Sequence, residues 1–86
     1  MRVVAVESST LATVGYDAIG GLLQLEFRNG AVYHYFGVPA AVHQRLLSAR
    51  SKGSFFNWSI RGSFPYCQVS ERLSAEHAIA VVQGQE

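Results

Sequence analysis

The sequence predicts an α+β fold, in which a small antiparallel β-meander of three to four strands packs against a pair of helices. Three features of the 86-residue chain lead to this expectation. Alternating apolar residues flank an Asn-Gly pair at positions 29–30, which is a strong β-hairpin signal. After Pro39 the apolar residues recur at helical spacing, and a short aromatic segment between two glycines follows. With an apolar fraction of 49%, residues 1–86 are expected to form a single domain.

The first half of the chain is expected to form consecutive strands joined by short turns. Residues 3–6 are a β-branched run that suits an edge strand, and a polar Ser-Ser-Thr cluster then turns the chain. Residues 11–17 show a two-residue alternation, which predicts a second strand. Gly15 within it indicates either a bulge or the close approach of another element. The next turn ends in two glycines, and the hairpin of residues 22–39 follows directly.

The loop length of this hairpin decides which face of the sheet Tyr33 and Tyr35 occupy. With a two-residue Asn-Gly loop, both tyrosines join the polar face and form an exposed stacking platform. With a three-residue loop at positions 28–30, Tyr33 lies opposite Leu25 and joins the core, while His34 faces solvent. We favour the second register, because tyrosine rings with a hydroxyl at the rim are common at the boundaries of cores.

Two helices are expected in the second half of the chain. The first is amphipathic and runs from about Pro39 to Arg50, with Pro39 at the first helical position, where no N–H is needed. Gly53 is the expected left-handed cap at its end. Ser54 is the expected N-cap of a second, short helix over residues 55–61.

The second helix and the tail complete the expected elements. Phe56 and Ile60 fall on one face of the short helix, which makes them core candidates. In the tail, residues 73–83 favour a last helix with Ser74 as its cap, and the alternative is a strand over residues 78–82.

A series of short motifs runs along the chain in this order: Ser8-Ser9, Val14-Gly15-Tyr16-Asp17, Leu25-x-Phe27-x-Asn29-Gly30, Tyr33-x-Tyr35, Gly37-Val38-Pro39, Leu46-Leu47, Ser51-x-Gly53 and Phe56-Asn57-x-x-Ile60-Arg61-Gly62. Their order and spacing resemble those of the KTSC domain, a family named for a domain at the C-terminus of some lysyl-tRNA synthetases and also seen as small free-standing bacterial proteins. The resemblance covers about residues 3–66 and leaves residues 67–86 as a C-terminal extension. It implies a small α+β domain with a central Tyr-x-Tyr and a proposed RNA-binding role.

Charge is distributed unevenly along the chain. The net charge is only +1, yet residues 27–70 contain five basic residues and no acidic residue. An acid-free segment with interleaved aromatics suits single-stranded RNA, whose bases stack on exposed rings while cations contact the phosphates. The alternative is an ordinary solvated helix face. The candidate nucleic-acid-binding residues are Tyr33, Tyr35, Arg28, Arg45, Arg50, Lys52, Arg61 and Asn57.

A protein partner, or a second copy of the chain, is the alternative to RNA. Phe55, Phe56 and Trp58 lie so close together on a short helix that they cannot all be buried beneath it. Trp58 is the candidate interaction anchor, because tryptophan is enriched in binding hot spots. The competing interpretation is that Trp58 caps the small core.

No catalytic residue, metal site or cofactor is expected, so the chain is predicted not to be an enzyme. His34, His43 and His77 lie on different elements and lack the spacing of metal ligands. Cys67 is the single cysteine, which favours a reducing compartment and a role as a small buried hydrophobe. The N-terminal apolar run is too short for a signal peptide or a membrane span, so we expect a cytoplasmic protein without a membrane partner.

Overall fold

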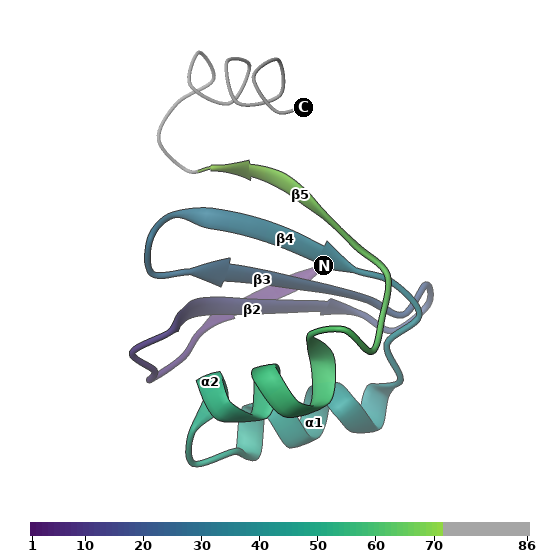
Figure 1. The fold of residues 1–86 in the computed structure, drawn as a ribbon. Helices are drawn as coiled ribbons and strands as arrows, with labels where there is room; N and C mark the ends of the chain where they lie inside the picture. Colours follow the sequence, from purple (N-terminus) through teal and green to yellow (C-terminus); the bar gives the residue numbers. More distant parts are fainter. Residues whose placement is uncertain (72–86) are drawn as a thin grey trace.

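The computed structural model describes residues 1–71, which form a five-stranded antiparallel sheet with a helical layer on one face (Figure 1). The strands lie side by side in chain order. The elements are β1 (Arg2–Ala5), β2 (Leu11–Asp17), β3 (Leu22–Phe27), β4 (Ala31–Tyr35), α1 (Ala40–Ser48), α2 (Lys52–Phe55), the π-helical turn η1 (Phe56–Ile60) and β5 (Tyr66–Glu71). The α+β class is confirmed, but the sheet has one strand more than the three to four expected. The predictions for residues 73–83 and 78–82 lie outside the described residues.

β5 is the strand that the sequence does not predict. It pairs antiparallel with β4, and its first residue, Tyr66, lies opposite Tyr35. Both helices lie between β4 and β5 in the chain, so the pairing is not local (Figure 1). Sequence reasoning finds only that residues 64–66 are extended, because the alternation within a strand does not identify a distant partner.

The β3–β4 hairpin has the three-residue loop. Leu25 lies opposite Tyr33, and Leu23 lies opposite Tyr35. Gly30 adopts a φ of 96°, a conformation that glycine accepts without a steric penalty. The favoured register is therefore confirmed, and it places Tyr33 and Tyr35 on the same face as the leucines of β3.

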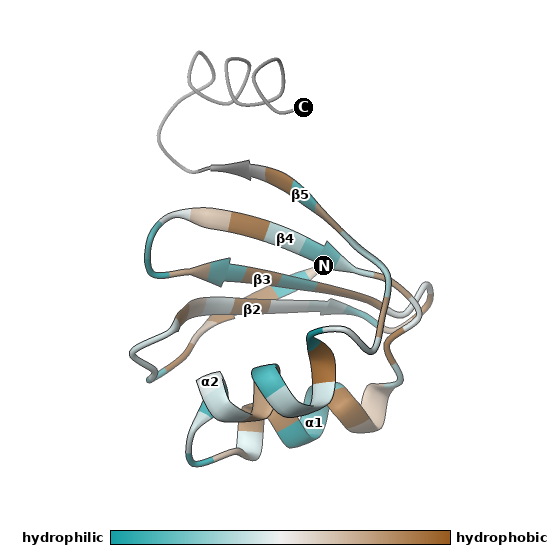
Figure 2. Ribbon diagram, viewed as in Figure 1, coloured by the Kyte–Doolittle hydropathy of each residue, from teal (hydrophilic) through white to brown (hydrophobic). Residues whose placement is uncertain are grey.

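The hydrophobic core lies between that face and the helices. β2 and β3 contribute two fully buried side chains each, whereas none of the residues 66–69 of β5 is buried. Figure 2 shows the hydrophobic last turn of the second helix approaching the sheet, and Phe56 and Ile60 are both buried there, as expected. The core residues are Leu11, Val14, Leu23, Leu25, Tyr35, Val38, Leu46, Phe56 and Ile60. The helices thus cover this face at β2 and β3 and leave the β5 end without a covering layer.

The helix boundaries differ from those expected. Pro39 has an extended ψ of 151° and lies one residue before α1, as its N-cap. Ser51, not Ser54, caps α2, since its hydroxyl accepts a hydrogen bond from the Ser54 N–H at 3.2 Å. Gly53 lies inside α2 and is not a left-handed cap. A Cβ at this position would overlap the side chain of Thr10, so the glycine lets α2 approach the β1–β2 loop.

Gly15 marks a close approach, which is one of its two expected roles. A Cβ on Gly15 would lie 2.7 Å from the sulfur of Met1 and 2.9 Å from a methyl group of Val3. The bulge of β2 occurs elsewhere, between Leu11 and Thr13. The side chains of Met1 and Val3 therefore lie over Gly15, and a side chain at this position would have to displace them.

Candidate nucleic-acid interface

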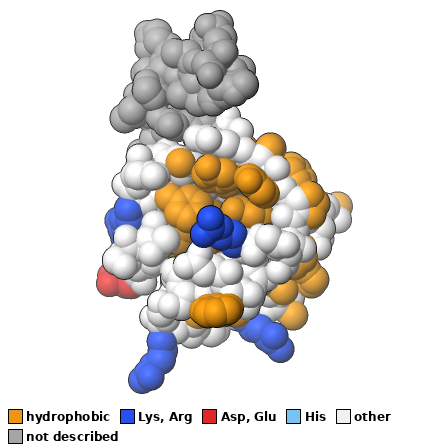
Figure 3. All heavy atoms as spheres, in the orientation of Figure 1, with side chains coloured by type: hydrophobic (Ala, Val, Ile, Leu, Met, Phe, Trp, Pro, Cys, Tyr) orange, Lys and Arg blue, Asp and Glu red, His pale blue; other side chains and the backbone are white. Residues whose placement is uncertain are grey.

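An aromatic cleft of about 300 Å³ opens between the uncovered end of the sheet and the end of η1. This volume is at the lower end of the range for small-molecule sites, roughly 300–1,000 Å³. Figure 3 shows hydrophobic side chains around a hollow on this face, with a basic side chain among them. The cleft is lined by Phe27, Asn29, Ala31, Tyr33, Tyr35, Phe56, Arg61, Gly62 and Tyr66.

Three tyrosines form the sheet side of the cleft. Tyr33 and Tyr35 alternate along β4, and Tyr66 on β5 is the cross-strand neighbour of Tyr35. The ring centroids of Tyr35 and Tyr66 lie 5.5 Å apart with 29° between the ring planes, and those of Tyr33 and Tyr66 lie 5.8 Å apart. Tyr35 is 4% exposed and Tyr66 is 59% exposed. Tyr35 therefore forms the floor of the cleft, and Tyr66 presents its most accessible ring.

Two phenylalanines join the cleft to the hydrophobic core. Phe27 meets Tyr33 edge-on, with ring centroids 5.7 Å apart, and Phe56 meets Tyr35 in the same way at 5.7 Å. The phenylalanine rings contact each other at 5.3 Å and 75°. Edge-to-face pairs are favourable because the positive edge of one ring meets the negative face of the other. These contacts hold the tyrosine rings in position in the unliganded protein.

The polar groups of the cleft suit a ligand that is anionic or that has a planar ring with polar edges. The pKa of Tyr35 is raised to about 12, chiefly by burial and then by the neighbouring Tyr33 and Tyr66 hydroxyls, while Arg61 acts in the opposite direction. The Tyr35 hydroxyl therefore keeps its proton at neutral pH. Within residues 1–71, the three tyrosine hydroxyls and the Arg61 guanidinium have no hydrogen-bond partner, so they are available to a ligand.

Three of the residues predicted to bind nucleic acid, Tyr33, Tyr35 and Arg61, come together in this cleft. Two other predicted residues are engaged in the fold. The Arg28 side chain donates to the backbone carbonyl of Ser8 at 2.9 Å, which ties the hairpin loop to the β1–β2 connection. The Lys52 ammonium donates to the Ala49 carbonyl at 2.9 Å, at the end of α1.

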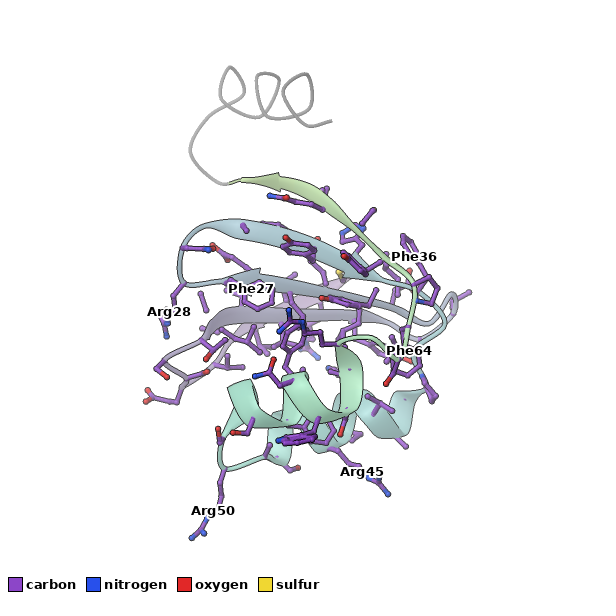
Figure 4. The ribbon with its side chains drawn as sticks, in the orientation of Figure 1. Phe27, Arg28, Phe36, Arg45, Arg50 and Phe64 are labelled. Carbon is purple, nitrogen blue, oxygen red and sulfur yellow. The ribbon has the colours of Figure 1, made fainter. Side chains whose placement is uncertain are left out.

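The remaining predicted residues lie away from the cleft. Figure 4 shows Arg45 and Arg50 extending from the helical layer in the direction opposite to the sheet. Asn57 is exposed on η1 but does not line the cleft. Trp58 is 86% exposed, so it does not cap the core. The five basic residues therefore do not form one patch, and Arg61 is the one that meets the aromatic rings.

Sequence reasoning misses six of the lining residues, namely Phe27, Asn29, Ala31, Phe56, Gly62 and Tyr66. Phe56 is expected in the core, where it does lie, but its ring also reaches the cleft. Asn29 is recognised only as a turn residue. Tyr66 offers a usable signal, because it follows Pro65 in an extended segment and could alternate with Gln68 on a strand face.

Other side chains that could bind a metal or react either have structural partners or lie apart from one another. Within the part of the chain that the structure describes, no three histidine, cysteine or acidic side chains gather around a common point. The His34 ring lies on the opposite sheet face and hydrogen-bonds the Gln24 side chain at 2.8 Å. The His43 ring stacks on Tyr16 at 4.5 Å, and burial lowers the pKa of His43. Cys67 is exposed on the edge strand β5, so the expectation of a buried thiol is wrong.

None of the helices within residues 1–71 has the length and apolar character needed to cross a bilayer.

Comparison with known proteins identifies similar domains. The family model of the KTSC domain matches residues 7–64. An uncharacterized protein of Stutzerimonas stutzeri is 47% identical over 57 residues, which are 66% of this chain and 80% of that protein. A crystal structure of a KTSC domain protein from Yersinia pestis superposes with a TM-score of 0.78 at 38% identity, covering 80% of this chain and 97% of that one.

A much larger protein contains a similar segment. The lysine–tRNA ligase of Trichormus variabilis is 41% identical over 64 residues. The match covers 74% of this chain and 11% of the ligase.

Proposed function

This chain belongs to the KTSC domain family, and from that premise we propose that it is a non-enzymatic binding module that takes a base of single-stranded RNA into the aromatic cleft. The observation that carries the proposal is the meeting of three tyrosine rings with the Arg61 guanidinium, which has no hydrogen-bond partner among the described side chains, at a single concave site. Aromatic platforms with a nearby cation are the usual means by which proteins hold unpaired bases.

The rings supply the affinity. Tyr66 is largely exposed and Tyr33 is half-buried, so a planar base can contact ring surface without any rearrangement of the core. Stacking of a base on an aromatic side chain contributes about 1–3 kcal/mol. Since every base has a flat face, stacking alone provides binding with little sequence preference.

Arg61 supplies the charge. It is the only ionised side chain among the described residues that line the cleft, and a guanidinium can bind a phosphate through two parallel hydrogen bonds. One phosphate contact on a single strand corresponds to a salt slope of about −0.7. Affinity is therefore expected to fall only about 2.5-fold between 50 and 200 mM salt.

A relative gives independent support. The lysine–tRNA ligase of Trichormus variabilis acts, by its name, on tRNA, and one segment of it is similar to this chain. A small domain that holds unpaired bases would suit an enzyme with an RNA substrate.

The test is a fluorescence-anisotropy titration of fluorescein-labelled hexauridylate. Tyr33→Ala removes one stacking ring, so we expect the affinity to fall about 5- to 150-fold. Phe36→Ala is the matched control, because Phe36 is also an exposed ring but does not line the cleft. Circular dichroism checks that both variants fold. Equal affinities of wild type and Tyr33→Ala, or no binding by the wild type, would refute the proposal.

The second candidate function is a protein interaction or self-association through Trp58. The observation in its favour is that this large apolar side chain is 86% exposed, and tryptophan is prominent among interface hot spots. Sedimentation velocity over a range of protein concentrations tests self-association. A concentration-dependent dimer that Trp58→Ala abolishes would support it, and a monomer at every concentration would exclude it.

A further inference from the structure

We propose that the aromatic cleft prefers bases with a carbonyl oxygen at pyrimidine C4 or purine C6, uracil and guanine, over bases with an amino group there, cytosine and adenine, because the Asn29 side chain presents hydrogen-bond donors to it and Arg61 adds no acceptor. This inference rests on the proposed RNA-binding function and adds a base specificity to it.

Asn29 is fixed as a donor by the hairpin turn. Its side-chain oxygen Oδ1 accepts a hydrogen bond from the backbone N–H of Ala31 at 3.0 Å. A backbone N–H can only donate, so the oxygen of the amide must face the turn. The Nδ2 amino group is consequently the end of the amide that the turn does not use. Asn29 is one of the residues that line the cleft, so we infer that this amino group is available to a ligand there. It carries two N–H donors and no acceptor.

The other polar groups of the cleft do not offset this bias. Arg61 has five N–H donors and no acceptor, and no aspartate or glutamate is among the described residues that line the cleft. The backbone carbonyls of Phe27 and Phe56 already accept bonds from the N–H groups of Gly30 and Arg61, at 2.9 and 2.8 Å. The tyrosine hydroxyls can donate or accept, so they do not distinguish the bases.

The four bases differ in whether they present a hydrogen-bond acceptor or a donor at pyrimidine C4 or purine C6. Guanine presents the acceptors O6 and N7, and uracil presents O4 at the position where thymine does. Cytosine presents an N4 amino group and adenine an N6 amino group at the corresponding positions. An amino group opposite the Asn29 amino group would leave two donors facing each other without an acceptor.

The experiment compares two pairs of oligonucleotides whose bases have the same ring system and differ in the group at pyrimidine C4 or purine C6 and in the protonation of the adjacent ring nitrogen. Anisotropy titrations are made with labelled hexauridylate and hexacytidylate, and with a hexamer of inosine and one of adenosine. One hydrogen bond gained or lost corresponds to a roughly two- to tenfold change in affinity. We expect the keto member of each pair to bind more tightly by that factor.

Two variants test whether Asn29 is responsible. Asn29→Ser retains an oxygen for the Ala31 N–H and replaces the amide donors with a hydroxyl, which can donate or accept and does not distinguish the bases, so both affinity ratios are expected to fall to about one. Asn29→Asp retains the turn bond and the Asp-Gly hairpin signal but places an acceptor at the cleft, so the ratios are expected to invert. Its negative charge weakens all four oligonucleotides together, and the ratio within each pair is therefore the readout.

The outcomes separate this inference from the function on which it rests. If Tyr33-dependent binding occurs with equal affinity for both members of each pair, the base preference is refuted and the RNA-binding function stands. A preference for the amino bases, or a keto preference that Asn29→Ser does not change, also refutes it. If none of the four oligonucleotides binds, both proposals fail.

Discussion

The two ends of one sheet face have opposite properties. At the β2–β3 end, Val14, Leu23 and Leu25 are fully buried beneath the helices. At the β4–β5 end of the same face, the residues that continue these cross-strand rows are Tyr33, Tyr35 and Tyr66. Of these three tyrosines only Tyr35 is buried, and the space above them is the aromatic cleft.

The difference follows from the sizes of the two layers. The sheet has five strands, whereas the helical layer consists of one nine-residue helix and a shorter one that ends in η1. This layer cannot cover every strand, so the chain places aliphatic residues where it does and tyrosines where it does not. Tyrosine suits the boundary because its ring packs on apolar groups while its hydroxyl stays in contact with water. One face thus provides both the core and the aromatic cleft, and each region should respond differently to substitution.

The largest expected effect is at the covered end. Leu25→Ala should lower the free energy of unfolding by about 2–5 kcal/mol, because it removes buried methyl groups and leaves a cavity. A domain of this size has a total stability of roughly 4–13 kcal/mol, so the variant should be at most marginally folded. Urea denaturation followed by circular dichroism measures the change. A loss below about 1 kcal/mol would show that this end does not hold the fold together.

At the uncovered end, Tyr66→Ala should change binding instead of folding. Its ring is 59% exposed, so the free energy of unfolding should fall by no more than about 1 kcal/mol. The affinity for hexauridylate should fall about 5- to 150-fold, since a stacking partner is lost. Tyr66→Phe keeps the ring and should bind nearly as well as the wild type. A Tyr66→Ala protein that unfolds easily and binds normally would contradict the account, because it would show that Tyr66 stabilises the fold and does not contribute to binding.

A smaller effect is expected for the charge at the cleft. Arg61→Gln removes the guanidinium and should change the salt slope of RNA binding from about −0.7 to about zero. Arg61→Lys keeps a positive charge and should retain most of the slope, although it loses the bidentate geometry. Titrations at several salt concentrations measure the slopes of all three proteins. If Arg61→Gln retains the wild-type slope, a cation outside the cleft contacts the phosphate.

The smallest effect at neutral pH concerns Tyr35, the floor of the cleft. Its pKa is raised from 10.0 to about 12 in the folded protein, so the folded state disfavours the ionised form. The contribution of the protonated Tyr35 hydroxyl to the free energy of unfolding is therefore complete below pH 10 and is lost as the pH rises from 10 to 12.

Tyr35→Phe separates this titration from that of the other tyrosines. The urea midpoint of the wild type minus that of the variant should stay constant below pH 10. Above pH 10 this difference should fall, because only the wild type loses the contribution of Tyr35. A difference that does not change with pH would show that Tyr35 titrates alike in the folded and unfolded chains.

Local patterns in the sequence predict much of the covered end. The Asn-Gly pair and the alternation around it predict the hairpin, and the suitability of tyrosine for a core boundary favours the register that forms. The shared spacing of Phe56 and Ile60 predicts their buried face. The helix caps are predicted less well. Gly53 has the position of a left-handed cap, but its actual role depends on the contact with Thr10, which is distant in the chain.

The uncovered end is predicted only in part, because it is assembled from distant segments. Tyr33, Tyr35 and Arg61 are found from the family motifs and the charge distribution. Tyr66 enters the site only through the pairing of β5 with β4, and Asn29 only because its amide is oriented by the Ala31 N–H. The β4–β5 pairing joins segments that are distant in the chain, so it has no signal in the local sequence.

The most direct test of the central claim is the mapping of hexauridylate binding by NMR, using ¹⁵N-labelled protein and amide chemical shifts. The account predicts saturable shift changes at residues 27–35, 56–62 and 66–68, with little change at the N-terminal residues 1–6 or along α1. Shift changes centred on α1 and Trp58, or no changes at any RNA concentration, would contradict the claim that the aromatic cleft binds RNA.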